Sequence, residues 1–159
     1  MRSETSDPLV TNLGHDLSLV RELAEASQHL AVLAIARGDG SVHASLVSAG
    51  VLSDPWTGAD AVGVVVRGGA RKLSLLRTTG RATLIFKDGF RWVAVEGAAR
   101  LEGPNDPPPT ARQGHLAETL RDIFRAAGGM HEDWDEYDRV MAQEQRCAVF
   151  VQVESVTTN

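Results

Sequence analysis

The chain of 159 residues is 43% hydrophobic and carries a formal net charge of -5. That is enough apolar material for one globular domain, and no run approaches the roughly 18 apolar residues of a membrane helix. An acidic balance with only 5% aromatic residues differs from nucleic-acid-binding proteins, which usually combine basic patches with stacking aromatics. We therefore expect a protein that binds neither nucleic acid nor a membrane.

The N-terminal end is polar and leads into a helix. Residues 1–16 are predicted to be a flexible segment ahead of one folded domain, residues 17–159. The first residues lack the apolar core of a secretory signal, so a cytoplasmic location is expected. Asp16 can cap a helix that runs to about Gln28, because apolar residues recur at helical spacing after it.

The next part of the chain predicts strands joined by short turns. Gly38-Asp39-Gly40 is typical of a hairpin turn between two apolar segments, and Asp88-Gly89 gives the same signal later. A short helix at about 70–77 is expected between the third and fourth strands. The strands expected here are 30–36, 41–51, 61–66, 81–86 and 90–101.

A proline-rich loop at 103–109 separates this part from a helical one. Helices are predicted at 110–127, which Gly128-Gly129 would end, and from about residue 131 or 133. The face of Trp134, Tyr137 and Met141 indicates core or dimer packing rather than a substrate pocket. With a last strand at 148–156, the chain has six strands and about four helices. Strands joined mostly by short turns favour an antiparallel barrel, so the fold is mainly β with flanking helices.

Residues 61–87 hold six cationic side chains and no acid. Since the chain has 16 Lys and Arg and 21 Asp and Glu, the other 10 cations (16 minus 6) accompany all 21 acids. Gly68 and Gly69 let a phosphate approach the backbone at the start of the short helix. The window therefore predicts an anion-binding site. Its cations are Arg67, Arg71, Lys72, Arg77, Arg81 and Lys87.

Other chemistry has little support in the sequence. There is no Gly-x-Ser-x-Gly, P-loop or Cys-x-x-Cys motif. The one cysteine, Cys147, is interpreted as a buried structural thiol, because no histidine lies near it in the sequence. His131-Glu132-Asp133 resembles a set of metal ligands, but a helix start explains its acids, and no metal is expected.

The order of these signals resembles the pyridoxamine 5'-phosphate oxidase-like split β-barrel superfamily. The resemblance covers roughly residues 18–156 and rests on the hairpin at Asp39-Gly40, the Gly-Ala-Arg-Lys at 69–72 and the strand ending at 95–101. The segment 131–141 is similar to an actinobacterial branch that uses the deazaflavin coenzyme F420. The resemblance implies a six-stranded split barrel of the FMN-binding type, a homodimer and a cofactor groove that the partner completes.

The resemblance also implies cofactor contacts. In the relatives a Ser-Arg-Lys at the start of the short helix holds the cofactor phosphate. Here Arg71 and Lys72 match and Ala70 replaces the serine. An Arg and a Lys beside a helix N-terminus favour a phosphate on physical grounds as well. The ring would lie against the second and third strands, mainly on backbone groups. The cofactor-binding residues expected in this way are His43, Ser45, Leu46, Val47, Ser48, Val65, Val66, Arg67, Gly68, Arg71, Lys72, Arg77 and Trp92.

Two departures shift the expected cofactor from FMN to F420. Flavin-dependent oxidases of the superfamily place an Arg early and a Lys late on the second strand, where this chain has Ser45 and Gly50. The expected function is then an F420-dependent reductase that transfers hydride to a small unsaturated or conjugated organic acceptor. Two alternatives stay open: an F420 or flavin carrier or sensor without turnover, and an FMN-dependent oxidoreductase of the same fold. The catalytic residue is unknown, and His43 is the one candidate for a proton donor.

Overall fold

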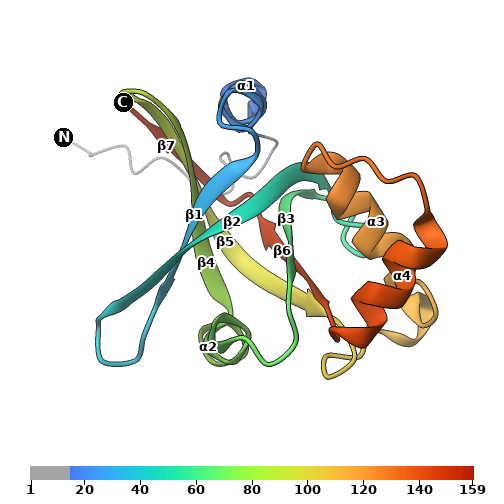
Figure 1. Cartoon of the computed structure of the whole chain (residues 1–159). Coiled ribbons are helices and arrows are strands. Elements are labelled where there is room, and N and C mark those ends of the chain that lie inside the picture. The colour runs from blue at the N-terminus through green and yellow to red at the C-terminus, as the bar shows by residue number, and fades with distance from the viewer. Residues whose placement is uncertain (1–14) are drawn as a thin grey trace.

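The computed structural model describes residues 15–159, so all but the last two residues of the predicted flexible segment 1–16 lie outside it (Figure 1). The helices in this part are α1 (Ser18–Ala26), α2 (Arg71–Thr79), α3 (Leu116–Ala126) and α4 (Trp134–Gln143). A short 3-10 turn spans Thr110–Arg112. The strands are β1 (Leu30–Ala36), β2 (Val42–Ser53), β3 (Asp60–Val66), β4 (Arg81–Asp88), β5 (Arg91–Glu102), β6 (Cys147–Gln152) and β7 (Ser155–Thr158).

Six strands close into an antiparallel barrel. They follow the order β4-β1-β2-β3-β6-β5, and β5 pairs again with β4. This confirms the predicted six-stranded barrel with flanking helices. Figure 1 shows α1 at one end of the barrel, α2 at the other, and α3 with α4 on one side. Between residues 15 and 159, no helix combines the length and apolar character needed to cross a membrane.

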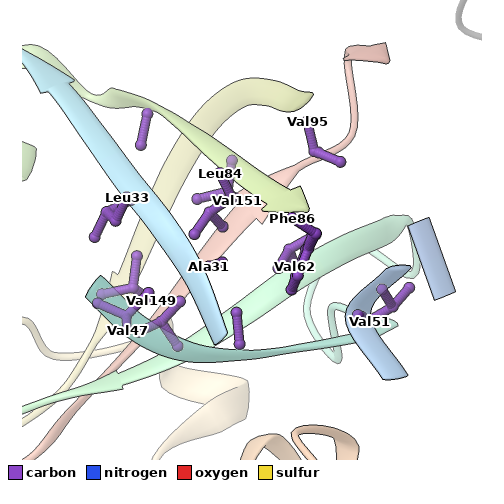
Figure 2. Packing of buried hydrophobic residues seen from close by; sticks show 14 of the residues in the cluster. Ala31, Leu33, Val47, Val51, Val62, Leu84, Phe86, Val95, Val149 and Val151 are labelled. Atoms are coloured by element: carbon purple, nitrogen blue, oxygen red, sulfur yellow. The ribbon is translucent and has the colours of Figure 1, made fainter. Parts of the chain in front are cut away.

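The barrel core follows from alternating side chains. In β1, Leu33 and Ile35 are buried and their neighbours along the strand are more exposed, and Leu84 and Phe86 repeat the pattern in β4. Figure 2 shows these buried side chains directed into one interior. Both α1 and α2 add apolar side chains to the same cluster, so they close its two ends. Every second residue of these strands therefore forms the inner face of the barrel.

The sequence predicted one continuous last strand at 148–156, but the structure divides this segment. It is divided into β6 and β7, and residues 97–98 of β5 face residues 152–154, which is a β-bulge. A Cβ atom on Gly97 would lie 1.8 Å from the carbonyl oxygen of Gln152. Only glycine allows the two backbones to cross this closely. β7 pairs with β5 outside the closed barrel.

The predicted helix at 110–127 also begins later than expected. Residues 110–112 form a separate 3-10 turn, and α3 starts at Leu116. Gly114 lies between them with φ +83, a left-handed conformation that ends the first turn. The later helix begins as predicted, because the Asp133 side chain accepts a hydrogen bond from the Glu136 amide at 3.1 Å.

A second apolar cluster joins α3 and α4 to the outside of β3 and β6. Tyr137 is buried in it, with its ring centroid 4.9 Å from Phe124 and 5.4 Å from Trp134. The Tyr137 hydroxyl donates a hydrogen bond to the Leu120 carbonyl at 3.3 Å. The aromatic face of α4 is therefore packing against α3, as the sequence indicated.

The barrel is split between β2 and β3. Their ladder runs only from the Ser53–Asp60 pair to the Ala49–Val64 pair, while residues 42–48 of β2 pair with β1. Beyond Val64, β3 continues along β6. Residues 42–48 of β2 and the last residues of β3 therefore do not pair with each other. The gap between them lies near the end of β3, which leads directly to α2.

Candidate functional site

The start of α2 has the features of an anion-binding site. Gly69 precedes it with φ +80, and Ala70 occupies the capping position in an extended conformation without a side-chain hydrogen bond. Among residues 15–159, the amides of Arg71 and Lys72 have no backbone acceptor. Unpaired amides at a helix N-terminus carry partial positive charge and bind phosphate groups well. The serine missing at Ala70 leaves this end uncapped.

Three cationic residues lie beside these amides in the chain. Arg67 and Arg71 are exposed and Lys72 is half-buried, and none of them forms an ion pair within the described residues. We refer to Arg67, Gly68, Gly69, Arg71 and Lys72 as the cradle. Charges that no carboxylate of residues 15–159 neutralises are available to a ligand.

Two other cations of the basic window are paired. Arg77 makes two hydrogen bonds to the carboxylate of Asp106, at 2.8 and 2.7 Å, and this pairing lowers the pKa of Asp106. Arg81 lies 3.0 Å from Glu154 and 3.5 Å from Glu96. Arg77 therefore has a carboxylate partner, whereas the cradle cations have none among residues 15–159. A cofactor role for Arg77 would require competition with Asp106.

Gly68 anchors the cradle to the turn between α4 and β6. Its amide donates to the carbonyl oxygen of Glu144 at 3.1 Å, and a Cβ atom at this position would lie 2.6 Å from the Gln145 carbonyl oxygen. Gln145 itself has φ +51, which is uncommon for a residue other than glycine. Gly68 is thus needed for packing, and Gly69 is the glycine with open space beside it.

The expected contacts on β2 divide between two faces. Leu46 and Ser48 are exposed on the outside, whereas Val47 is buried in the core and can reach a ligand only through its backbone. His43 and Ser45 share the face of Val47 because side chains alternate along a strand. The Ser45 hydroxyl is buried without a hydrogen-bond partner among the described residues.

His43 lies near the end of the barrel that carries α2. Its partner on β1 is Ile35, which comes directly after the residues that pair with β4, and β4 itself begins directly after α2. Its Nδ1 atom is 3.4 Å from an Arg37 nitrogen. A guanidinium only donates hydrogen bonds, so this contact requires an Nδ1 atom that carries no proton. The Nε2 atom lies on the side of the ring away from Arg37.

The two valines expected on β3 do not offer their side chains to an open groove. Val66 is buried in the barrel core, and Val65 packs towards the cluster of α3 and α4. Because the ladder to β2 ends at Val64, the backbone of Val65 and Val66 is unpaired on that side within residues 15–159. These positions could contact a ring through backbone groups only, as the sequence analysis proposed.

Trp92 lies away from the cradle. It pairs with Lys87, whereas Arg81, directly after α2, pairs with Ala98 at the other end of the β4–β5 ladder. Six residues of strand separate these pairs, which is a distance of roughly 20 Å. One copy of the chain therefore does not bring Trp92 to the cradle.

Gly50 cannot be replaced by the lysine of the flavin-dependent oxidases in this backbone. A Cβ atom on Gly50 would lie 2.3 Å from the carbonyl carbon of Ala126 and 2.5 Å from the Ala127 nitrogen. The C-terminal end of α3 occupies the space that a longer side chain would need. This contact gives a structural reason for the departure noted in the sequence.

The sequence analysis missed a buried ionic cluster beside α3. Asp54 and Glu102 are fully buried, and Arg100 bonds Asp54 twice and Glu102 once, each at 2.8 Å. Burial raises the pKa of Asp54, but hydrogen bonds from Arg100, the Trp56 amide and Gln152 outweigh it and lower the pKa. One signal was available, since Arg100 and Glu102 share a strand face. The cluster holds the loop after β2 against the barrel.

Cys147 is buried, and burial raises the pKa of its thiol to about 12. The thiol is therefore protonated at neutral pH and does not act as a nucleophile. Within residues 15–159, no group of three or more His, Cys, Asp or Glu residues is placed to hold a metal ion.

The chain was compared with known proteins. No protein family profile matches it. A stretch of 81 residues is 35% identical to a biliverdin reductase of Mycobacterium tuberculosis that depends on reduced coenzyme F420. The match covers 51% of this chain and 56% of that protein, so it spans about half the length of the relative.

Two solved structures have a similar fold. A conserved hypothetical protein of Mycobacterium tuberculosis superposes with a TM-score of 0.64 at 16% identity, over 92% of this chain and 86% of that chain. A predicted pyridoxamine 5'-phosphate oxidase of Listeria innocua gives a TM-score of 0.51 at 17% identity, over 88% and 96%. Identities this low establish the fold alone.

Proposed function

We propose that this chain, which has the split β-barrel fold of the pyridoxamine 5'-phosphate oxidase-like superfamily, is a reductase that uses the deazaflavin coenzyme F420. The observation that carries the proposal is the cradle at the start of α2, which within residues 15–159 combines three cations without an ion pair and two amides without a backbone acceptor. Such a group of donors suits a phosphate that is part of a larger cofactor. The partial match to an F420-dependent relative supports this cofactor.

Arg71 and Lys72 would hold the phosphate of the cofactor, with Arg67 beside them. Its ring would lie along the split between β2 and β3, where residues 46–48 pair only with β1 and residues 65–66 only with β6 in the described part of the chain, so neither segment pairs across the split. F420 is preferred over FMN because Gly50 leaves no room for the lysine of the FMN enzymes. The bound, reduced deazaflavin supplies a hydride.

The acceptor is proposed to be a small unsaturated or conjugated organic molecule. A hydride from the cofactor and one proton add across its double bond, so the acceptor gains two electrons and the deazaflavin is oxidised. His43, in its protonated form, is the candidate proton donor because it lies at the α2 end of β2, on the face of Ser45 and Val47. The relative acts on biliverdin, a conjugated molecule, which supports this class of acceptor.

A homodimer is proposed because one copy leaves the site incomplete. Trp92 lies about 20 Å along the barrel from the α2 end, so a shared cofactor site needs Trp92 from a second copy. The outer face of β1 and β2 also carries exposed apolar side chains, and Leu46 is 64% and Val42 59% exposed. We call Leu30, Val42 and Leu46 the outer strip. An exposed apolar strip on a sheet typically marks an interface.

The proposal is tested by titrating the purified protein with F420 and with FMN side by side, following cofactor fluorescence. We expect tighter binding of F420, and tighter binding of FMN would contradict the cofactor assignment. Reduced F420 bound to the protein is then mixed, without oxygen, with enones, quinones and biliverdin. Reoxidation by one of them supports a reductase, whereas persistent reduction across the panel would favour a carrier.

A further inference from the structure

A cavity of about 240 Å³ lies between α3 and α4, which cover one side of the barrel (Figure 1). Its walls are mainly apolar. Leu116, Ala117 and Leu120 form the α3 side, Met141 and Ala142 form the α4 side, and Pro104 borders it. Cavities between packed helices are common places for small ligands.

The charges at this cavity are already neutralised. Asp138 is paired with Arg121, whose Nε atom donates at 2.8 Å, and Arg146 is paired with Glu144, with its Nε atom at 2.7 Å. A charged ligand would therefore find no free counter-charge here and would lose its hydration. A neutral ligand has no such penalty.

The size of the cavity limits the ligand to one or two rings. A dry protein cavity of about 150 Å³ is known to hold benzene. The 240 Å³ here is larger, but it is too small for a tetrapyrrole. Met141 can adapt to the ligand because its side chain is flexible and polarisable.

One wall of the cavity is connected to the cradle by hydrogen bonds. The carbonyl oxygens of Met141 and Ala142 accept from the amides of Arg146 and Gln145, at 3.0 and 3.1 Å. In the same turn, the carbonyl oxygen of Glu144 accepts a hydrogen bond from the Gly68 amide at 3.1 Å. A shift of the end of α4 therefore moves an acceptor of the cradle loop.

We propose that the cavity between α3 and α4 binds a neutral apolar molecule of one or two rings, and that its occupancy is transmitted to Gly68. The binding site stands independently of the cofactor. The consequence of the change at Gly68 for cofactor binding rests on the function proposed above, in which the cradle holds the cofactor phosphate.

The test uses the cofactor-free protein labelled with ¹⁵N and titrated with indole, followed by amide chemical shifts. We expect saturable shifts at Leu120 and Met141, and a shift at Gly68 that follows the same binding curve. Indole-3-carboxylate, which has the same ring and one negative charge, should bind at least about tenfold more weakly.

Two variants narrow the cavity from exposed positions, so they leave the core intact. Ala142→Leu and Ala117→Leu should each weaken indole binding at least about tenfold. Gln143→Leu adds the same side chain one position along α4 and should leave binding unchanged. Absence of saturable shifts at the cavity, or unchanged binding in both alanine variants, would overturn the site.

A Gly68 amide that does not move while the cavity saturates would overturn the transmission. Failure of F420 titration in the same preparation would affect only the proposed function, because indole binding is measured without cofactor.

Discussion

Arg71 and Lys72 allow a sharp test of the cradle. Neither side chain forms an ion pair within residues 15–159, so Arg71→Ala combined with Lys72→Ala removes no observed ion pair. The free energy of unfolding should change by less than about 0.5 kcal/mol. Each charge-assisted hydrogen bond to a phosphate contributes about 1.5 to 3 kcal/mol. Even after a discount for solvent exposure, losing both should exceed about 1.4 kcal/mol, or tenfold in affinity.

The assay is a fluorescence titration with F420 at low and at physiological salt. The loss of affinity should be larger at low salt, because screening weakens the contribution of exposed charges. A matched control is Arg21→Ala combined with Arg139→Ala, which removes the same charge from exposed positions on α1 and α4. This control should bind F420 within about twofold of the unmodified protein.

An unchanged affinity in the cradle variant would refute the cradle assignment. An equal loss in the control would show that general charge, and not the position of these two side chains, determines binding. Urea unfolding of both variants separates either result from a loss of structure.

Three further predictions concern assembly, stability and reactivity. Light scattering should show a dimer, and Leu46→Glu should yield monomers with weaker cofactor binding; a monomer that binds F420 tightly would contradict the shared site. Arg100→Ala should lower the free energy of unfolding by about 3 to 5 kcal/mol at pH 7, because buried Asp54 loses its counter-charge and Glu102 keeps only Arg112. Arg100 lowers the pKa of Asp54, so the stabilisation from this pair is present above the pKa of Asp54 in the unfolded chain and fades as the pH falls. The loss of stability in Arg100→Ala should therefore shrink near pH 4. A loss of stability that does not depend on pH in urea unfolding would argue against this pairing. With a pKa of about 12, the Cys147 thiol should resist alkylation at pH 8 until the protein unfolds, and rapid labelling of the native protein would show that it is accessible.

Local patterns predicted most of the barrel. The apolar run at 30–36 and the turn signals at Asp39-Gly40 and Asp88-Gly89 predicted strands and hairpins that the structure confirms. The break between β6 and β7 escaped prediction because it depends on Gly97, which lies on a different strand. The late start of α3 had a local signal, Gly114, whose left-handed conformation only the structure reveals.

The site was harder to predict from the sequence, because ion pairs join residues far apart in the chain. Nothing near Arg77 in the sequence indicates that Asp106 will bind it, so Arg77 was expected among the cofactor contacts together with Arg71 and Lys72. The structure leaves Arg71 and Lys72 as cations at the helix start. The same argument applies to Asp54 and Arg100, which become partners only when the loop after β2 folds onto β5.

The contact between Gly50 and α3 constrains which side chains position 50 could acquire during evolution. A lysine at this position requires more than a codon change, because the backbone at Ala126 occupies the place of its first side-chain carbon. The end of α3 would have to withdraw first, by a shorter helix or a different loop at 127–129. A chain with glycine here would therefore acquire a lysine at position 50 only through a sequence of coupled changes, each of which must keep the barrel side covered.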